Sequence, residues 1–519
     1  MLDVGCWMLN LPPTPASEDV MAKQPNVLVI LSDQHRADTI GVGPVAQFCR
    51  TRNLDRLGAQ SVVLANHRAN AALCVPSRNS LLTSTWPQVN GAVVNGWSAA
   101  ELPFATMREG LETLYDALVR AGYEVIHLGV DHLRAAPPLR GRAGMRFACS
   151  PAEHRNELAQ KGIARPHPEV RTPCIDFERG RAVAVTYTNP TPVVWEGPAE
   201  YFFDLWLANR TVKELESLDN ERPFALFVNF WAPHCPLACP EPYFSMYAPE
   251  DVPLPEDVGQ WFDGQSPLNL LHTPGTTALN LGLETWRHAW AVYCGMVTLV
   301  DEAIGRVLDA LRASGRWDET LVWMSSDHGE MLGSHGLFQK MCLYEPAVRV
   351  PAMVKPPTSA GARPRAVEAL TQHLDVAPTI LDYVGADPLA TASTGPEAGR
   401  SLRPTIEEDK PPGRRSMIMC FDGNSGRGFH QRAIFDGRYK LIHNHGLQAD
   451  DPPGRFAAEL YDLQDDPLEV RNCLNDATDE EQAAAEDLLG ALVQWMIRVD
   501  DLIPPPGPEV LRSSLPDSG

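Results

Sequence analysis

A cysteine, Cys74, stands two residues before Pro76 and four before Arg78, where the chain is expected to enter a helix. Proline suits the first turn of a helix, because the N–H that it lacks has no intrahelical partner there. Cys74 would lie at the positive end of this helix, where backbone N–H groups and Arg78 can receive an anion. The alternative is an incidental buried cysteine, but Ser77 and Leu82-Thr83 complete a longer pattern. The segment therefore predicts an anion site at residue 74.

Four short apolar runs indicate buried β-strands, at residues 27–31, 123–129, 225–229 and 321–325. Helical patterns at 111–120 and 296–311 alternate with them, which predicts an α/β fold with a mostly parallel sheet covered on both faces. The strands are followed by Asp33-Gln34-His35, Asp131-His132, Trp231-Ala232-Pro233-His234 and Asp327-His328. One polar residue after a strand is usually only a turn. Because ligands gather at the carboxyl ends of strands in such sheets, four clusters favour a single site.

Asp33, Gln34, Asp327 and His328 come from two of these strand ends and are the predicted ligands of one divalent metal ion. Hard cations take oxygen ligands, and Mn²⁺ also accepts imidazole nitrogen. This set would leave positions open for a nucleophile and for an oxygen of the substrate. The structural alternative is that Asp33 caps the next helix and that Asp327 makes a turn.

The whole chain limits the class of protein. Its 519 residues are enough for a large core and for two domains. The formal net charge of -22 argues against nucleic acid or an anionic membrane as a partner, so a local charge such as a metal must attract an anionic substrate. No apolar run reaches the roughly 18–20 residues of a membrane span. The 11 cysteines lack paired spacing and the N-terminus lacks a secretory pattern, so we expect reduced thiols in a cytoplasmic protein.

The pattern C-x-P-S-R followed by L-T resembles the signature of the type I sulfatases, which belong to the alkaline phosphatase superfamily. In that family a maturation enzyme oxidises the cysteine to Cα-formylglycine, whose hydrated aldehyde is the nucleophile. The resemblance runs from about Asn26 to about Asn472 and departs at Ser84, where the family usually has glycine. It implies that Cys74 becomes formylglycine, contacts the metal and attacks sulfur or phosphorus.

The resemblance also implies roles around the transferred group. Arg78 would hold the formylglycine, His132 would contact the transferred group, and His234 would contact the substrate and protonate the leaving oxygen. Lys340 would bridge the transferred group and that oxygen. Histidine suits proton transfer because its unperturbed pKa lies near neutrality. Val130 stands where many sulfatases have a lysine, which removes one positive charge from the expected pocket. The alternatives are a loop role for His234 and a surface role for Lys340.

The ligand set also points to a branch of the family. Many sulfatases have two aspartates at the first ligand pair and an Asp-Asn pair at the second, around calcium. Gln34 and His328 replace two of these residues here, which lowers the negative charge and adds a nitrogen ligand. This combination is more similar to phosphonate monoester hydrolases and choline-sulfatases. Mn²⁺ and Ca²⁺ both stay open as the metal.

We expect four segments along the chain. They are 1–24, a disordered or misassigned extension; 25–403, an alkaline phosphatase-like catalytic domain; 404–502, a smaller C-terminal α+β subdomain with an antiparallel sheet; and 503–519, a proline-rich tail that is disordered or docks on another subunit. In the subdomain, strands are expected at 432–442 and 459–463 and a helix at 480–499. The stretches 133–198 and 236–277 are rich in proline and glycine and are predicted to be irregular loops at the rim of the site.

These observations predict a metal-dependent hydrolase of small organic sulfate esters, of the arylsulfatase type. Activity on phosphonate monoesters and phosphodiesters is expected too, because all three are tetrahedral anions with one charge and one leaving group. The first alternative is a phosphonate monoester hydrolase or phosphodiesterase with minor sulfatase activity. The second is a non-catalytic anion-binding protein that kept the fold. The expected partners are the ester substrate, the maturation enzyme and further copies of the chain in a dimer or tetramer, without nucleic acid or membrane.

Overall fold

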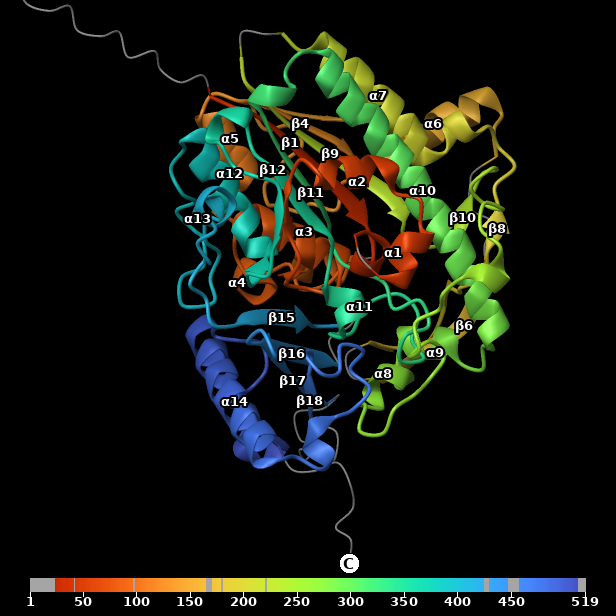
Figure 1. Ribbon diagram of the computed structural model, residues 1–519, viewed down its shortest axis with the longest axis vertical. Helices are drawn as coiled ribbons and strands as arrows, with labels where there is room; N and C mark the ends of the chain where they lie inside the picture. The colour runs from red at the N-terminus through yellow and green to blue at the C-terminus, as the bar shows by residue number, and fades with distance from the viewer. Residues whose placement is uncertain are drawn as a thin grey trace, which may run out of the picture.

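The computed structural model describes residues 24–41, 43–96, 99–164, 170–178, 181–219, 222–423, 429–446 and 457–511. Its centre is an eight-stranded sheet in the order β13-β2-β12-β11-β1-β9-β4-β5, in which only β12 runs antiparallel to the rest (Figure 1). The strands are β1 (Asn26–Asp33), β2 (Val62–Leu64), β4 (Glu124–Gly129), β5 (Met145–Ala148), β9 (Phe224–Pro233), β11 (Thr320–Ser326), β12 (Ala352–Lys355) and β13 (Arg365–Val367). This sheet confirms the predicted fold class.

Helices cover both faces of the sheet (Figure 1). One face carries α1 (Pro44–Phe48), α2 (Arg52–Gly58), α7 (Phe203–Ser217) and α10 (Leu283–Ala313), and the other carries α3 (Cys74–Thr83), α5 (Leu114–Arg120) and α12 (Val376–Val384). Successive side chains of β1 alternate between the two layers: Leu28 and Ile30 pack on the first, Val27 and Val29 on the second. Because both faces are covered, every residue of β1 is buried, as its continuous apolar run predicts.

The four predicted strands correspond to β1, β4, β9 and β11, which are neighbours in the order β11-β1-β9-β4 and run parallel. Their carboxyl ends therefore lie along one edge of the sheet. The predicted helices correspond to α5 and α10, although α10 begins at Leu283, well before residue 296. Its first turns include exposed Leu283 and His288, so the apolar spacing there is weaker than in the buried remainder.

The two stretches predicted to be irregular contain regular structure, so that prediction was wrong in part. Residues 133–198 include β5, α6 (Pro151–Lys161), the antiparallel hairpin of β6 (Arg171–Glu178) and β7 (Arg181–Thr188), and β8 (Val193–Val194). Residues 236–277 include β10 (Ala238–Cys239), α8 (Leu268–Leu271) and most of α9 (Thr273–Ala278). The start of α6 was readable, since Ser150 and Glu153 form a capping box around Pro151. Strand β6 was not predicted because it contains Pro173, and proline is tolerated only in a strand at the edge of a sheet.

A second, four-stranded antiparallel sheet follows near the C-terminus (Figure 1). It consists of β15 (Met417–Phe421), β16 (His430–Phe435), β17 (Tyr439–His445) and β18 (Ala458–Asp462), and α14 (Asp479–Val499) covers one face. In the expected tail, Ile503, Val510 and Leu511 are buried in the same cluster as α14. Residues 512–519, like residues 1–23 of the expected extension, lie outside the described ranges.

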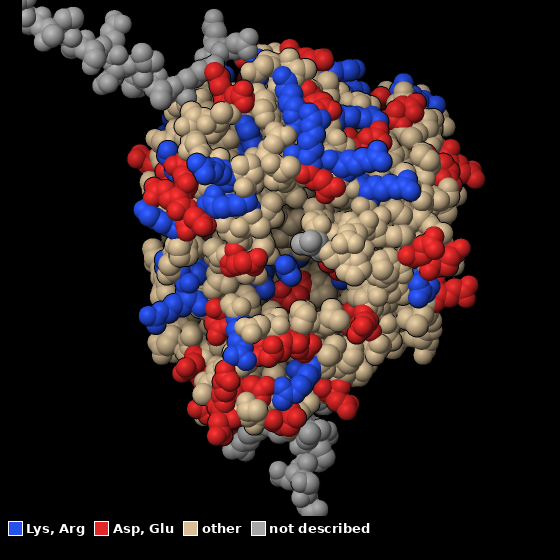
Figure 2. Space-filling view, in the orientation of Figure 1, with Lys and Arg blue, Asp and Glu red and all other residues tan. Residues whose placement is uncertain are grey.

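Short elements complete the described structure: β3 (His67–Arg68), β14 (Thr371–Gln372), α4 (Pro87–Asn90), α11 (Glu345–Val348) and α13 (Arg403–Glu408). Every cysteine that the structure describes is a free thiol. Within the described ranges, no helix combines the length and the apolar character that crossing a membrane requires. Acidic and basic side chains are interspersed on the face shown in Figure 2.

A buried charge cluster joins the C-terminal sheet to the segment around α11. Lys440 of β17 donates from its Nζ to Leu343 O at 2.9 Å and to Glu345 Oε1 at 3.1 Å, and it forms an ion pair with Glu469. Arg68 forms a second ion pair with Glu345, at 2.7 Å. Burial opposes the ionisation of Glu345, but Arg68 and Lys440 outweigh it and lower the pKa of Glu345 to about 2. The cluster is therefore held together as paired charges.

Replacing Lys440 by methionine should destabilise the protein by about 3–5 kcal/mol, because two buried carboxylates would then share a single cation. The measurement is the midpoint of urea unfolding. Lys410→Met is the control, since Lys410 is 69% exposed and its loss should change the stability by less than about 0.5 kcal/mol. Equal midpoints for the Lys440 variant and the wild type would contradict the prediction.

Candidate active site

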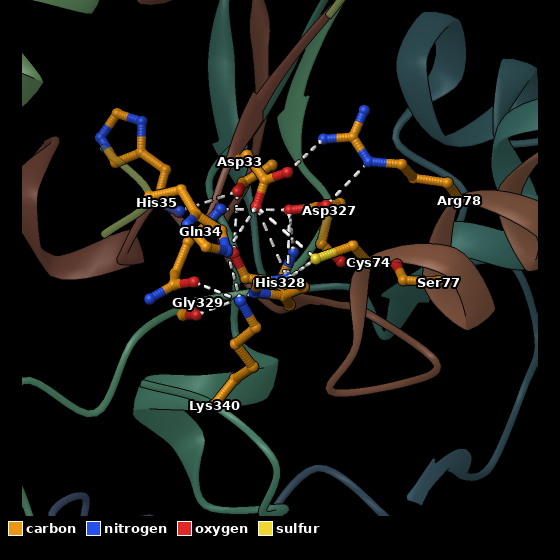
Figure 3. A network of polar contacts seen from close by, with 12 residues as sticks. Asp33, Gln34, His35, Cys74, Ser77, Arg78, Asp327, His328, Gly329 and Lys340 are labelled. Atoms are coloured by element: carbon orange, nitrogen blue, oxygen red, sulfur yellow. Dashed lines mark hydrogen bonds and ion pairs between the residues drawn. The ribbon is translucent and has the colours of Figure 1, made fainter. Parts of the chain in front are cut away.

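The start of α3 meets the ends of β1 and β11 (Figure 3). Cys74 Sγ lies 3.8 Å from Asp33 Oδ1 and 3.1 Å from His328 Nε2. Asp33, Cys74, Asp327 and His328 each place one ligand atom within 4.8 Å of those of the other three, and all four residues are buried. The structure thus brings together the predicted nucleophile and three of the four other predicted metal ligands.

Helix α3 is fixed at both of its ends. Near its start, Ser77 Oγ donates to Asp327 O at 2.5 Å and lies 3.0 Å from His373 Nδ1. At its end, Ser84 adopts a left-handed conformation with φ 53°, and its Oγ donates to Leu374 O at 2.7 Å. A left-handed residue at this position favours glycine, which gives a physical reason for the glycine usual in sulfatases. The departure at Ser84 is therefore local and hydrogen-bonded.

Arg78 connects three of the strands. Its Nη2 donates to Asp33 Oδ2 at 3.0 Å, its Nε to Asp327 Oδ2 at 2.8 Å and its Nη1 to Asn229 Oδ1 at 2.9 Å. The guanidinium is buried and presents its donors in a planar fork, which suits several carboxylates at once. These hydrogen bonds hold Asp33 and Asp327 in place, so the main contacts of Arg78 are with the predicted metal ligands.

The two aspartates have opposite protonation tendencies. Burial, reinforced by the charge of Asp327, raises the pKa of Asp33 to about 7 although Arg78 and Lys340 oppose this. Burial also opposes the ionisation of Asp327, but the charge of Arg78 outweighs it and lowers the pKa of Asp327. Burial lowers the pKa of His328 to about 3, so its imidazole is neutral and can donate a lone pair.

The chemistry of this donor set fits a divalent cation. Two carboxylates supply hard oxygen donors, the neutral imidazole of His328 supplies one nitrogen, and position 74 completes the set. Oxygen donors with a single imidazole suit Mn²⁺, whereas Ca²⁺ takes oxygen ligands almost exclusively. A cation would also balance the negative charge of two aspartates that share one buried guanidinium.

Gln34 lies beside this cluster and has a strained backbone. Its φ of 64° is left-handed, and its backbone N–H donates to Asp327 Oδ1 at 3.1 Å. The hydroxyl of Tyr293 donates to Gln34 O at 2.8 Å and accepts from Arg36 N at 2.9 Å, which fixes the turn after β1. The side-chain amide of Gln34 lies between Glu330 and Lys340.

His234 and Lys340 form a pair next to Asp33. Lys340 Nζ lies 2.6 Å from His234 Nε2, and His234 Nδ1 lies 2.5 Å from Cys235 O. Because a carbonyl oxygen only accepts, Nδ1 carries the proton and Nε2 accepts from the lysine. His234 Nε2 also lies 3.9 Å from Asp33 Oδ1. Both side chains therefore reach the cluster.

His132 reaches the cluster from the end of β4. Its Nδ1 lies 3.9 Å from Asp33 Oδ2 and has no hydrogen-bond partner among the described residues although it is buried. Burial and the charge of Arg78 lower the pKa of His132 to about 3. Val130 is buried in the apolar core beside α7 and α10, so it does not replace the lysine usual in sulfatases.

Sequence reasoning missed several residues that hold this site together. Asn229 accepts from Arg78, Glu330 accepts from Gln34, and His373 contacts Ser77. Asn229 closes the predicted strand 225–229 and Glu330 follows Asp327-His328-Gly329, so the position of each along the chain was a usable signal. His373 lies far from any predicted strand end and carried no such signal.

Comparison with known proteins supports this geometry. The profile of the family described as Sulfatase matches residues 25–386, well over half of the chain. The chain belongs to the sulfatase family. Residues 333–494 of this sulfatase also match the profile described as N-sulphoglucosamine sulphohydrolase, C-terminal. The predicted family membership is therefore confirmed.

Among curated proteins, this sulfatase is 27% identical to the multifunctional alkaline phosphatase superfamily protein PehA of Trinickia caryophylli, over 87% of this chain and 91% of that one. It is 26% identical to an arylsulfatase of Clostridium perfringens, over 87% of this chain and 90% of the arylsulfatase. Among solved structures, the phosphonate monoester hydrolase SpPMH of Silicibacter pomeroyi superposes with a TM-score of 0.73 and 25% identity. The superposition covers 92% of this chain and 96% of SpPMH.

A divalent cation bound at this cluster should stabilise the folded sulfatase by mass action. At a free concentration 100 times its Kd, the gain is about 2.7 kcal/mol. We expect Tm to be higher with Mn²⁺ or Ca²⁺ than with a chelator, and Asp327→Asn to abolish the difference.

Asp309→Asn is the matched control, because Asp309 is 58% exposed on α10 and its variant should keep the full metal-dependent shift. The two metals compared at equal concentration show which one the site prefers. A Tm of the wild type that is independent of both metals and of the chelator would refute the site.

Proposed function

We propose that this sulfatase hydrolyses small organic sulfate esters, of the arylsulfatase type, through a formylglycine at position 74. The observation that carries this proposal is the position of Cys74 at the start of α3, within reach of Asp33 and His328. We assign Asp33, Gln34, Asp327, His328 and residue 74 to the metal, and Arg78, His132, His234 and Lys340 to catalysis. Six of these residues lie at or just after the carboxyl ends of neighbouring strands, which supports both assignments: Asp33, Gln34, His132, His234, Asp327 and His328.

Two groups would supply the chemistry that unmodified side chains lack. As formylglycine, residue 74 would supply a hydrated aldehyde with one hydroxyl to attack sulfur and a second to expel the sulfate afterwards. A divalent cation, Mn²⁺ or Ca²⁺, would supply Lewis acidity that favours an ionised nucleophile and stabilises charge on the transferring group.

The other residues would bind the sulfate group and manage protons. Arg78 holds Asp33 and Asp327 in fixed positions at the start of α3. Lys340 donates one N–H to His234 Nε2, and a further N–H of its ammonium group would supply the proton for the leaving oxygen while His234 orients it. His132 offers a ring nitrogen without a partner in the described structure to the oxygens of the transferred group.

A second candidate function is the hydrolysis of phosphonate monoesters or phosphodiesters with minor sulfatase activity. The similarity to the phosphonate monoester hydrolase SpPMH favours it, as does the replacement of two acidic or amide ligands by Gln34 and His328. Both ester classes present a tetrahedral group with one negative charge. We therefore expect one site to act on both and place sulfate esters first.

The proposal carries further expectations. A formylglycine-generating enzyme must convert Cys74, and we expect a cytoplasmic protein that forms a dimer or tetramer. A non-catalytic homologue that only binds anions is the remaining alternative. The intact cluster around Cys74 argues against it, because loss of activity would remove the selection that keeps such costly buried charges.

Mass spectrometry of the peptide that contains residue 74 tests the nucleophile. In protein from the native host, we expect the mass of an aldehyde, CHO, in place of the CH₂SH group of cysteine. Cys74→Ala should lower kcat by a factor on the order of 10⁶, as removal of a nucleophile does in other hydrolases.

Cys149→Ala is the matched control, because Cys149 is only partly buried, lies outside the cluster and should be dispensable. An unmodified Cys74 in fully active native protein would refute the proposed mechanism. An unmodified Cys74 in inactive native protein would favour the anion-binding alternative.

The order of the two ester classes is tested by comparing kcat/KM for an aryl sulfate and for the phenyl phosphonate ester of the same phenol. We expect the sulfate to be hydrolysed more efficiently, with measurable activity on the phosphonate in the same preparation. The shared phenol keeps the leaving group constant. A strong preference for the phosphonate would reverse our order in favour of the second candidate.

A further inference from the structure

Glu330 is a buried carboxylate with no role in the mechanism described above. It is 1% exposed, and its Oε1 accepts from the backbone N–H groups of Leu332 at 2.8 Å and Gln339 at 2.5 Å. Its Oε2 accepts from the side-chain amide of Gln34. Three N–H donors thus converge on one carboxylate directly beside the metal-ligand cluster.

These contacts decide which way the amide of Gln34 points. A carboxylate only accepts hydrogen bonds, so the end of the amide that faces Glu330 must be its NH₂ group. An ammonium only donates, so the end that faces Lys340 must be the carbonyl oxygen. The two neighbours therefore agree on one orientation, with Gln34 Oε1 directed away from Glu330 and toward Lys340, whose ammonium group lies at the metal-ligand cluster (Figure 3).

The backbone around Gln34 is tied to the segment of Glu330 as well. Arg36 Nη1 donates to Glu330 O at 2.8 Å and to Met331 O at 2.9 Å. The turn after β1 and the segment after β11 therefore form one hydrogen-bonded unit. A change in the Glu330 side chain can alter the amide of Gln34 without releasing the backbone that carries it.

We propose that Glu330 is a positioning residue that turns the carbonyl oxygen of Gln34 toward the cation. The inference rests on the proposed metal site and adds the group that makes Gln34 an oxygen ligand. An amide is a ligand only through its oxygen, and a rotation by 180° would present N–H groups to a cation instead. Through Gln339 N, the same carboxylate also holds the segment that carries Lys340.

Glu330→Gln should weaken metal binding by about 10–100-fold, the usual cost of removing the partner of a metal ligand. The glutamine introduced at position 330 has only one oxygen that can accept hydrogen bonds. It cannot replace both oxygens of the carboxylate, which accept from Gln34 and from the two backbone N–H groups, so the orientation of the Gln34 amide is no longer imposed.

The swapped double variant Gln34→Glu/Glu330→Gln separates positioning from general support. A carboxylate at position 34 has two equivalent oxygens, so one can accept from the amide introduced at position 330 while the other faces the cation. We expect its metal affinity to return to within about threefold of the wild type, because one N–H···O bond and an oxygen donor are restored.

The readout is the Kd for Mn²⁺ and for Ca²⁺, measured by competition with a chromophoric chelator, with Tm as a check of folding. Glu459→Gln is the matched control. Glu459 is also buried and accepts from Tyr344, Asn444 and Tyr461, so its variant should lower Tm but leave metal affinity unchanged.

A Glu330→Gln variant with wild-type metal affinity would overturn the inference. So would a folded swapped variant without recovered affinity, or a failure of both variants to fold, because Glu330 would then support the chain rather than orient the amide. These results require no hydrolysis and no formylglycine. Failure of the wild type to bind either metal would instead refute the metal site on which the proposed function depends.

Discussion

The structure of the site depends on two aspartates that are buried against each other at the ends of adjacent strands. Asp33 and Asp327 share the guanidinium of Arg78, whose donors reach both carboxylates. A buried pair of like charges is costly unless cations compensate it, so the position of α3 and of its arginine follows from this requirement. Position 74 is close to the metal ligands because the same helix carries Cys74 one turn before Arg78. The proposed nucleophile and the charge compensation are therefore placed by one helix.

Much of the fold was predictable because its central strands are buried on both faces. Continuous apolar runs such as 27–31 and 225–229 have no other stable environment, and the sheet places them side by side. The hairpin of β6 and β7 lies outside that sheet, where alternation and proline give no comparable signal. The proline-rich composition of residues 503–511 did not indicate that three apolar side chains among the prolines pack in the cluster of α14. The proposed division of the chain at residue 403 stays a prediction.

The candidate site was predictable where a residue carries chemistry of its own. Asp33, Cys74 and Asp327 stand in motifs whose spacing reports their function, and the structure brings them together. Asn229 and Glu330 act only through the groups that they bind, so their types say little until the partners are known. The orientation of the Gln34 amide likewise depends on its partners. It is decided by Glu330, 296 positions away along the chain, and no local pattern can encode such a contact.

The hydrogen bonds of Arg78 also bear on the proposal that one site acts on two ester classes. Arg78 donates one N–H from each of its three nitrogens to Asp33, Asp327 and Asn229, so in our proposal the cation, Lys340 and His132 contribute most of the binding of the transferred group. A phosphonate monoester has phosphorus in place of sulfur and carbon in place of one free oxygen, while the tetrahedral shape and the single negative charge are the same. Because position 130 holds a valine and no lysine, one oxygen of a sulfate would lack a charged partner in the proposed site. A site without that partner loses little when the oxygen becomes carbon, which favours activity on both esters over strict selection.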